Sequence, residues 1–234
     1  GGAGRRRRLE GRLDERALAS YLTLGYVPAP RSIFRGIRKL PPATLLVAEN
    51  GRIAERRYWH VPDRVSDAID EATWTTRVRE GIDRAVHRQM VSDVPLSLSL
   101  SSGVDSSALL AVMSRHSSEP VRTFTVGFAG RERESEIGPA TDTARHFGAD
   151  PTGQVISEAD YAAFMARYLW HMEEPIGNDS APAYYFVARL AQANGIKVML
   201  NGQGPDETFG GYDRHRGAAL MDRLAPAGVV SLQV

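Results

Sequence analysis

A polar loop between an apolar strand and a helix limits the possible folds of this chain more than any other segment. Residues 94–100 are predicted to form a short buried strand and residues 106–115 the helix that follows, and the sequence LSSGVDSS spans the turn between them at 100–107. The first turn of a helix presents N–H groups without intrahelical acceptors and the positive end of the helix dipole, and both favour a phosphate. Gly103 lets the backbone approach a ligand closely, and the serine hydroxyls add donors. The loop therefore predicts a pyrophosphate site and a protein that binds ATP.

Asp105 has a different predicted role in this loop, because a carboxylate repels phosphate. We expect it to hold Mg²⁺, which binds carboxylate and phosphate oxygens at the same time. The loop lacks the lysine of a G-x-x-x-x-G-K-S/T motif, which disfavours γ-phosphoryl transfer of the P-loop type. The alternative is a serine- and glycine-rich turn with a capping aspartate, since these residues are common where helices begin.

A second glycine-rich loop follows another apolar strand. The strand is predicted at 195–200, and the sequence NGQGPDETFGGY follows it at 201–212. In an open parallel sheet, ligands bind outside the carboxyl ends of the strands, so the two loops can face one crevice. Asp206 would then be the second carboxylate for the Mg²⁺ on Asp105. The alternative is a tight turn in which Asp206 caps a helix.

Strands and helices alternate along the second half of the chain, which predicts an α/β fold with a parallel twisted sheet and helices on both faces. The further strands are expected at 121–128 and 152–156, and the helices at 71–90, 136–147 and 181–193. Ser97 and Ser99 interrupt the apolar pattern expected of a strand buried on both faces. Nearer the N-terminus, an Asn50-Gly51 turn between apolar runs predicts a β-hairpin.

The two loops resemble those of the glutamine-dependent asparagine synthetases, whose synthetase domain carries S-G-G-x-D-S-S and, further along, S-G-E-G-x-D-E-x-F-G-G-Y. The likeness covers nearly the whole chain. In the synthetase part it includes RQMVSDVPL at 88–96, TFTVGF at 123–128 and Glu174-Pro175. Residues 21–28 and 33–42 resemble the end of the family's glutaminase domain.

This resemblance implies two domains. Residues 1–62 would be the C-terminal part of a β-rich glutamine amidotransferase domain of the N-terminal-nucleophile type. Residues 63–234 would be the first part of an ATP-pyrophosphatase domain with an adenine-nucleotide α-hydrolase-like fold. The implied cofactors are ATP and Mg²⁺, and the implied substrates are aspartate or a related carboxylate and ammonia from glutamine. The implied process is asparagine biosynthesis, by an intact enzyme that is a homodimer.

The resemblance also implies the site residues. Asp105 and Asp206 would hold Mg²⁺. The residues expected to bind the pyrophosphate or the adenosine are Ser99, Leu100, Ser101, Ser102, Gly103, Val104, Asp105, Ser106, Val126, Asn201 and Gly202.

Three departures from the family pattern matter. Ser102 stands where the family has glycine, and its Cβ narrows the approach to the pyrophosphate. Gln203, the catalytic candidate, stands where many members have a glutamate that accepts a proton from ammonia; glutamine cannot act as a base, so it could only orient ammonia or the acyl-adenylate. The chain contains no cysteine, the nucleophile of the family's glutaminase. The sequence is therefore interpreted as a fragment of a longer enzyme that carries the cysteine and a catalytic lysine elsewhere.

The overall composition is typical of an ordinary soluble domain and indicates little else. The net charge of +1 calls for neither nucleic acid nor an anionic membrane as a partner. No apolar stretch reaches the roughly 18 residues of a membrane-spanning helix, and the N-terminus lacks the apolar core of a signal peptide. We expect a cytoplasmic location.

Two other function classes stay open on the sequence. One is a different amide-forming ATP-pyrophosphatase, either β-lactam synthetase-like or an amidotransferase that modifies a natural product or a glycan. The other is a module that binds nucleotide without turnover. The identity of the acceptor would separate the first class from asparagine synthesis, and turnover would separate the second.

The 234-residue polypeptide is predicted to have no glutaminase activity, because it has no thiol to attack the amide carbon of glutamine. Glutamate release from glutamine by the purified polypeptide should equal the release measured with a heat-denatured sample. Release above that background, in proportion to the amount of folded protein, would contradict the prediction.

Overall fold

The computed structural model describes residues 11–62, 69–175, 177 and 180–224. The chain forms two compact units. The first unit comprises Gly1–Trp74 and Glu158–Tyr184, and the second comprises Thr75–Ser157 and Tyr185–Val234. Each unit therefore combines two separate stretches of sequence.

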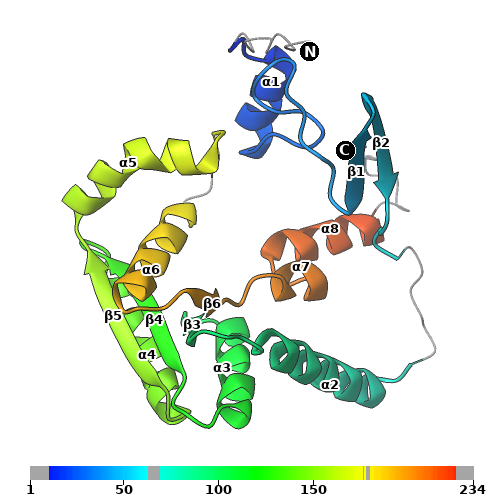
Figure 1. The fold of residues 1–234 in the computed structure, drawn as a ribbon. Helices are drawn as coiled ribbons and strands as arrows, with labels where there is room; N and C mark the ends of the chain where they lie inside the picture. Colours follow the sequence, from blue (N-terminus) through cyan, green and yellow to red (C-terminus); the bar gives the residue numbers. More distant parts are fainter. Residues whose placement is uncertain (1–10, 63–68, 176, 178–179, 225–234) are drawn as a thin grey trace. The chain divides into compact units, whose positions relative to one another are not determined.

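The second unit contains a four-stranded parallel sheet with the strand order β5-β4-β3-β6 (Figure 1). Its strands are β3 (Leu96–Ser99), β4 (Arg122–Phe128), β5 (Asp150–Ile156) and β6 (Val198–Leu200). From β3 the chain adds β4 and β5 on one side, and it then crosses to the other side of β3 to add β6. This reversal is the topological switch point of a doubly wound sheet, where ligands bind outside the carboxyl ends of the strands.

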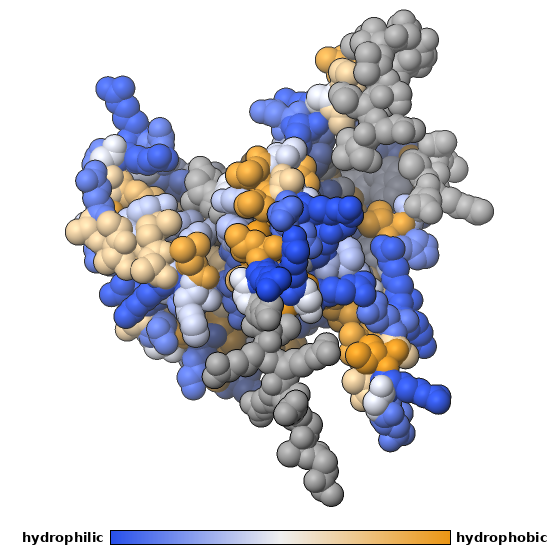
Figure 2. Space-filling model, turned by 90° about the horizontal axis from the view of Figure 1, so that it is seen from above, coloured by the Kyte–Doolittle hydropathy of each residue, from blue (hydrophilic) through white to orange (hydrophobic). Residues whose placement is uncertain are grey.

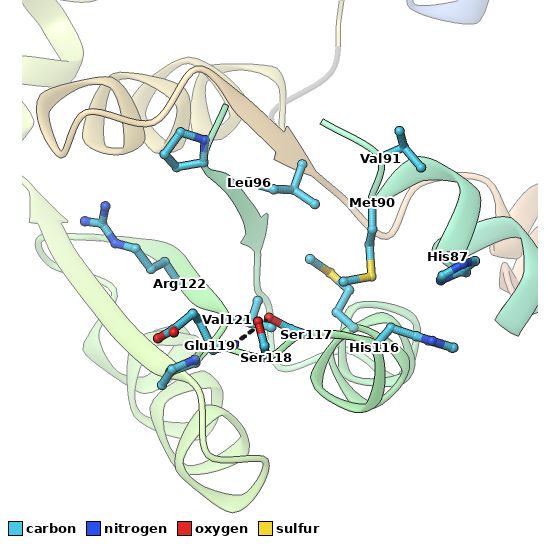
Figure 3. Close-up of a pocket in the computed structure, with 13 residues that line it drawn as sticks. His87, Met90, Val91, Leu96, His116, Ser117, Ser118, Glu119, Val121 and Arg122 are labelled. Atoms are coloured by element: carbon cyan, nitrogen blue, oxygen red, sulfur yellow. Dashed lines mark hydrogen bonds between the residues drawn. The ribbon is translucent and has the colours of Figure 1, made fainter. Parts of the chain in front are cut away.

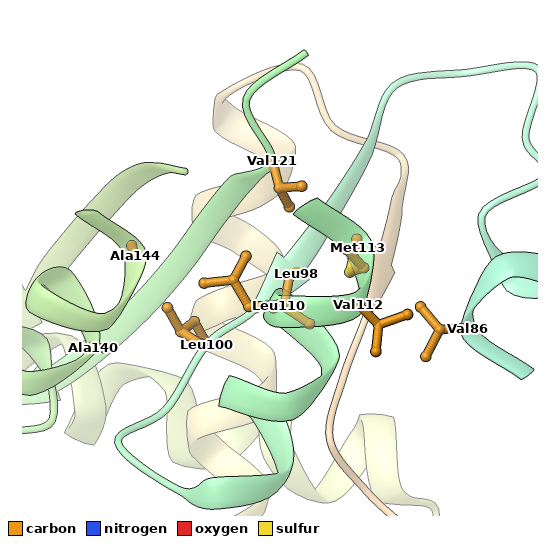
Figure 4. Close-up of a cluster of buried hydrophobic side chains, with 9 residues drawn as sticks. All are labelled: Val86, Leu98, Leu100, Leu110, Val112, Met113, Val121, Ala140 and Ala144. Atoms are coloured by element: carbon orange, nitrogen blue, oxygen red, sulfur yellow. The ribbon is translucent and has the colours of Figure 1, made fainter. Parts of the chain in front are cut away.

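Helices cover both faces of this sheet, which confirms the predicted α/β architecture. One face packs against α2 (Glu71–Gln89), α3 (Val104–His116) and α4 (Ile137–His146) in a cluster centred on Leu98 and Leu110 (Figure 4). On the opposite face, Phe124 packs against Val187, Leu190 and Ala191 of α6 (Ala181–Ala193). Leu98 and Phe124 are completely buried. Because successive side chains of a strand point to opposite faces, both faces of the central strands contribute to a core.

Of the two serines that interrupt the apolar pattern of β3, Ser97 is completely buried and Ser99 is partly buried. Ser97 has no exposed surface, and its hydroxyl lies 3.5 Å from the carbonyl oxygen of Val198 on the neighbouring strand. A buried hydroxyl with an acceptor in reach costs less free energy than an unpaired one. The edge strand β6 therefore supplies an acceptor for Ser97, which allows this serine to be buried in a central strand.

Most predicted elements of the second unit are present with shifted ends. The helix at 181–193 coincides with α6, whereas α3 begins two residues before the predicted start. Strand β6 is shorter than predicted at its beginning, because the N–H of Ile196 bonds to the carbonyl of Ala191 at the end of α6. The patterns gave no indication of the 3₁₀ turn η1 (Glu132–Glu134) or of α8 (Asp213–Leu224). Helix α7 (Pro205–Phe209) begins after Gly204, so Asp206 lies inside it and is not the N-cap of the alternative interpretation.

The first unit contains the predicted hairpin, formed by β1 (Thr44–Glu49) and β2 (Arg52–Arg57). Asn50 and Gly51 both have positive φ, as the predicted two-residue turn requires. Helix α1 (Glu15–Leu24) was not predicted; the Asp14 carboxylate accepts hydrogen bonds from the first-turn N–H groups of Arg16 and Ala17. Such caps stabilise the start of a helix.

Helix α5 (Glu158–Met172) and the segment after it also belong to the first unit. The N–H of Gly177 donates to the carbonyl of Gly25 at 2.7 Å, and Lys39 forms a 2.5 Å ion pair with Glu174. This compact unit thus includes residues from within the predicted second domain. The predicted boundary between residues 62 and 63 adjoins 63–68, which lie outside the described residues, and it stays a prediction.

Apolar residues are exposed among hydrophilic ones on the surface (Figure 2). Trp170 near the end of α5 is 82% exposed, and Val104 at the beginning of α3 is 83% exposed. None of the helices in the described part of the chain combines the length and apolar composition that crossing a bilayer requires.

Candidate nucleotide-binding site

The loop between β3 and α3 is braced from inside by the hydroxyl of Ser106. This hydroxyl accepts from the N–H of Ser101 at 3.1 Å and lies 2.8 Å from the Ser101 hydroxyl and 3.2 Å from the carbonyl of Gly103. The side chain of Ser107 donates to the same carbonyl at 2.8 Å. Because Ser106 is only 4% exposed, its hydroxyl shapes the loop, whereas Ser102 and Gly103 are exposed.

The end of β3 is fixed to β4 just before this loop. The N–H of Leu100 donates to the carbonyl of Phe124, and the buried hydroxyl of Thr125 donates to the carbonyl of Leu100 at 2.8 Å. Both backbone groups of Leu100 are therefore used within the sheet, and its side chain belongs to the core. Val126 packs against the cluster around Phe124 on the other face. Leu100 and Val126, which were predicted to contact the adenosine, therefore contribute to the sheet and to its two cores.

The loop after β6 lies directly against the beginning of α3. A Cβ atom on Gly202 would be 2.9 Å from the backbone nitrogen of Ser106 and 3.2 Å from its Cα, so only glycine allows this approach. The side-chain oxygen of Asn201 accepts from the N–H of Gln203 at 3.1 Å and shapes the turn. The structure thus brings together the two loops that the sequence placed about a hundred residues apart.

Asp206 lies in the first turn of α7, close enough to Asp105 to affect it electrostatically. Burial and then the charges of Asp206 and Glu207 raise the pKa of Asp105. Gly211 leaves room for the side chain of Asp206, since a Cβ atom on Gly211 would lie 1.9 Å from a carboxylate oxygen of Asp206. Its N–H also donates to the carbonyl of Asp206 at 3.0 Å.

Tyr212 holds the carboxylate of Glu207 through a hydrogen bond. The hydroxyl of Tyr212 donates to this carboxylate at 2.7 Å and lowers the pKa of Glu207, and the guanidinium of Arg214 stacks over the Tyr212 ring. Tyr212 was not predicted to have this role. The sequence signal for this contact is that Tyr212 and Glu207 lie in the same short glycine-rich loop, which can bring the two side chains together.

The donor set fits a metal ion that arrives with its nucleotide. Within the described residues, no cluster of three or more histidine, aspartate or glutamate side chains could hold a metal alone. Proteins commonly bind Mg²⁺ through one or two carboxylates, with phosphate oxygens and water as further ligands. Asp105 and Asp206 are two carboxylates that could act in this way, and burial first and then the charges of Asp206 and Glu207 raise the pKa of Asp105.

Gln203 lines a pocket of about 360 Å³ beside β6. Most of the lining is apolar, and none of the lining residues carries a titratable side chain. The lining residues are Ile82, Ala85, Val86, Gln89, Leu109, Met199, Leu200, Asn201, Gln203 and Pro205. This pocket therefore offers Gln203 no neighbouring base.

A second pocket, of about 510 Å³, lies at the amino-terminal ends of β3 and β4 (Figure 3). Its lining includes Leu96 and Arg122, which begin β3 and β4, and the two histidines His87 and His116. The amino-terminal ends of parallel strands lie opposite the carboxyl ends, where the switch-point crevice is found. This pocket is therefore separate from the two loops.

Comparison with known proteins identifies two family matches along the chain. Residues 77–229 match the asparagine synthase family, and residues 4–59 match the glutamine amidotransferase domain family. Asparagine synthetase (glutamine-hydrolyzing) 1 of Bacillus subtilis is 31% identical over 205 residues, which is 87% of this chain and 32% of that protein. A protein of Mycobacterium tuberculosis named for the same activity is 34% identical over 210 residues, or 87% of this chain and 31% of its own length. Amidase chyE of Penicillium rubens is 30% identical over 209 residues, covering 82% of this chain and 31% of the amidase.

The chain therefore belongs to the asparagine synthase family, and it spans about a third of the length of these relatives.

Gly211→Ala is expected to displace the carboxylate of Asp206, because the added methyl group would overlap it. The backbone at Gly211 is not left-handed, so it accepts alanine. Loss of a charge-assisted contact of about 1.5–3 kcal/mol should weaken Mg·ATP binding roughly ten- to hundredfold. Calorimetric titration measures the affinity for Mg·ATP. Gly217→Ala in α8, where a Cβ atom meets nothing within 4 Å, is the matched control. Equal affinity of the Gly211 variant and the unaltered chain would show that Asp206 does not contribute.

Asp105→Asn is expected to stabilise the ligand-free chain at neutral pH. A raised pKa means that the folded state binds this proton more tightly than the unfolded state, so the free energy of unfolding falls as pH rises from the ordinary carboxyl pKa through the raised one. The stability difference between variant and wild type should therefore be largest at neutral pH and shrink in acid. Denaturant unfolding across pH measures it, with Asp142→Asn on the exposed surface of α4 as control. A pH-independent difference would contradict this assignment.

Proposed function

We propose that this chain carries the ATP-binding part of an asparagine synthase-like amidotransferase. In the proposed reaction, the side-chain carboxylate of aspartate attacks the α-phosphorus of ATP and pyrophosphate leaves. Ammonia derived from glutamine then attacks the acyl carbon, AMP leaves, and the amide forms after loss of a proton. The observation that carries the proposal is the meeting of the serine-glycine loop with the loop bearing Asp206 at the switch point between β3 and β6.

Each element of the loop has a proposed part in adenylation. The first N–H groups of α3 and the exposed Ser102 and Gly103 face the pyrophosphate, while Ser106 keeps the loop in shape. Asp105 and Asp206 would hold Mg²⁺, which supplies positive charge beside the departing pyrophosphate. Because these groups are fixed before the nucleotide arrives, they stabilise the developing charge with little reorganisation.

The proposed nucleotide contacts are those predicted from the sequence, Ser99 to Ser106 in the first loop with Val126, Asn201 and Gly202 beside them. Gln203 is proposed to orient ammonia or the acyl-adenylate, with water or another group as the base. The proposal includes a division of the chain between residues 62 and 63, which lies between the two family matches. It also includes a cytoplasmic location and a homodimeric intact enzyme.

Mg·ATP binding by this chain tests the shared metal site. Asp105→Asn and Asp206→Asn should each weaken binding, and the double variant should lose less than the sum because both carboxylates act through one ion. Calorimetry in the presence and absence of Mg²⁺ measures these losses, with Asp142→Asn as control. Strictly additive losses would argue against a shared ion, and a wild-type chain that binds no nucleotide would refute the proposed function.

The acceptor is tested with the complete gene product by aspartate-dependent release of pyrophosphate from ATP. Release that depends on aspartate supports asparagine synthesis. Release with a different carboxylate instead would place the protein with other amide-forming ATP-pyrophosphatases, and nucleotide binding without release would indicate a binding module.

Gln203→Glu in the complete gene product should preserve pyrophosphate release, because the loop after β3 is unchanged. The new carboxylate can accept a proton, so the pH dependence of amide formation should change. Pyrophosphate and amide product are followed separately across pH for both forms. Identical pH profiles for amide formation would show that residue 203 has no part in handling ammonia.

A further inference from the structure

A carboxylate from the segment that connects β4 to α4 reaches the pyrophosphate loop, which is the loop between β3 and α3. The Ser102 hydroxyl donates a hydrogen bond to Oε1 of Glu136 at 3.2 Å. Glu136 directly precedes α4 and occupies its N-cap position, yet its side chain makes no capping hydrogen bond with that helix. The carboxylate is therefore directed to the loop, although the N–H groups of its own helix would also stabilise it.

The backbone on both sides of Glu136 is seated on the sheet. Ile137 packs over two glycines: a Cβ atom on Gly127 of β4 would lie 3.0 Å from the Ile137 side chain, and one on Gly153 of β5 would lie 2.7 Å from it. The hydroxyl of Ser135 lies 2.9 Å from the same position at Gly127. These close contacts hold residue 136 at the carboxyl ends of the strands, next to the loop that follows β3.

This contact affects both the donor properties and the charge of the loop. Ser102 has a single hydroxyl proton, and here it is given to Glu136. The carboxylate also adds a negative charge to a site that already contains Asp105 and Asp206. A phosphate chain without a metal would be repelled by all three carboxylates, whereas Mg²⁺ would offset the repulsion.

We infer that Glu136 is a positioning residue of the pyrophosphate loop, which orients Ser102 and makes the site discriminate in favour of metal-bound ATP over metal-free ATP. The inference rests on the proposed function, because it concerns the nucleotide that the loop binds. It also gives a role to the serine that replaces the family's glycine at position 102, since glycine offers Glu136 no hydroxyl.

Three variants separate the position of the hydroxyl from the charge. Glu136→Gln keeps an acceptor for Ser102 but removes the charge, Glu136→Ala removes both, and Ser102→Gly removes the hydroxyl and leaves the charge. Dissociation constants for ATP are measured by calorimetry with excess Mg²⁺ and with excess EDTA. Glu134→Gln, which changes the net charge equally at an exposed residue nearby, is the control.

Glu136→Gln is expected to strengthen the binding of metal-free ATP by roughly tenfold, with a much smaller change for Mg·ATP. The gain should shrink as salt is added, because mobile ions screen exposed charges. Ser102→Gly should keep the discrimination between the two nucleotide forms. Glu136→Ala should also lose it and bind Mg·ATP more tightly than Glu136→Gln, since the Ser102 hydroxyl proton is then free to bond to the pyrophosphate.

Equal changes for both nucleotide forms in Glu136→Gln, or the same gain in Glu134→Gln, would overturn the inference while leaving nucleotide binding intact. A wild-type chain that binds neither form would instead refute the proposed function and the inference together.

Discussion

The candidate site depends on the parallel pairing of β6 with β3. Leu98 lies beside Leu200 in this register, so the loops after the two strands begin next to each other. The loops then approach until the backbone of Gly202 contacts that of Ser106, a distance that any side chain at residue 202 would increase. Pairing on the other side of the sheet would leave Asp206 far from Asp105. The chemistry proposed here therefore follows from strand order.

The same approach concentrates negative charge. Asp105 is partly buried beside Asp206 and Glu207, and Glu136 reaches the loop from α4. In a ligand-free chain this arrangement costs stability, as functional sites commonly do. Specific contacts hold or accommodate these carboxylates: Tyr212 bonds to Glu207, Gly211 leaves room for Asp206, and Gly127 and Gly153 make room for Ile137 next to Glu136. A site arranged in this way is suited to a cation bound together with a polyphosphate.

The local patterns of the sequence predicted the central part of the second unit well. The strand, loop and helix from β3 to α3, the hairpin of the first unit and the full extent of α6 are present as expected. Helix α5 was missed because its apolar residues do not all face a core: Phe164 and Tyr168 are buried, whereas Leu169 and Trp170 are exposed. The helix belongs to the first unit together with the segment after it, in which Glu174 pairs with Lys39, and no local pattern reveals this long-range contact.

The sequence determined which chemical groups are available and where along the strands they stand. Glycine and serine at the end of β3, aspartates in both loops, and the absence of a P-loop lysine are local facts that the order of residues fixes. The tertiary structure decided which of these groups meet. It brought the backbone of Gly202 against Ser106, placed Asp206 close to Asp105 and gave Ser102 the carboxylate of Glu136. The physical reason is that backbone conformation depends on neighbouring residues, whereas a hydrogen bond between distant residues depends on strand order and packing, which the whole core sets.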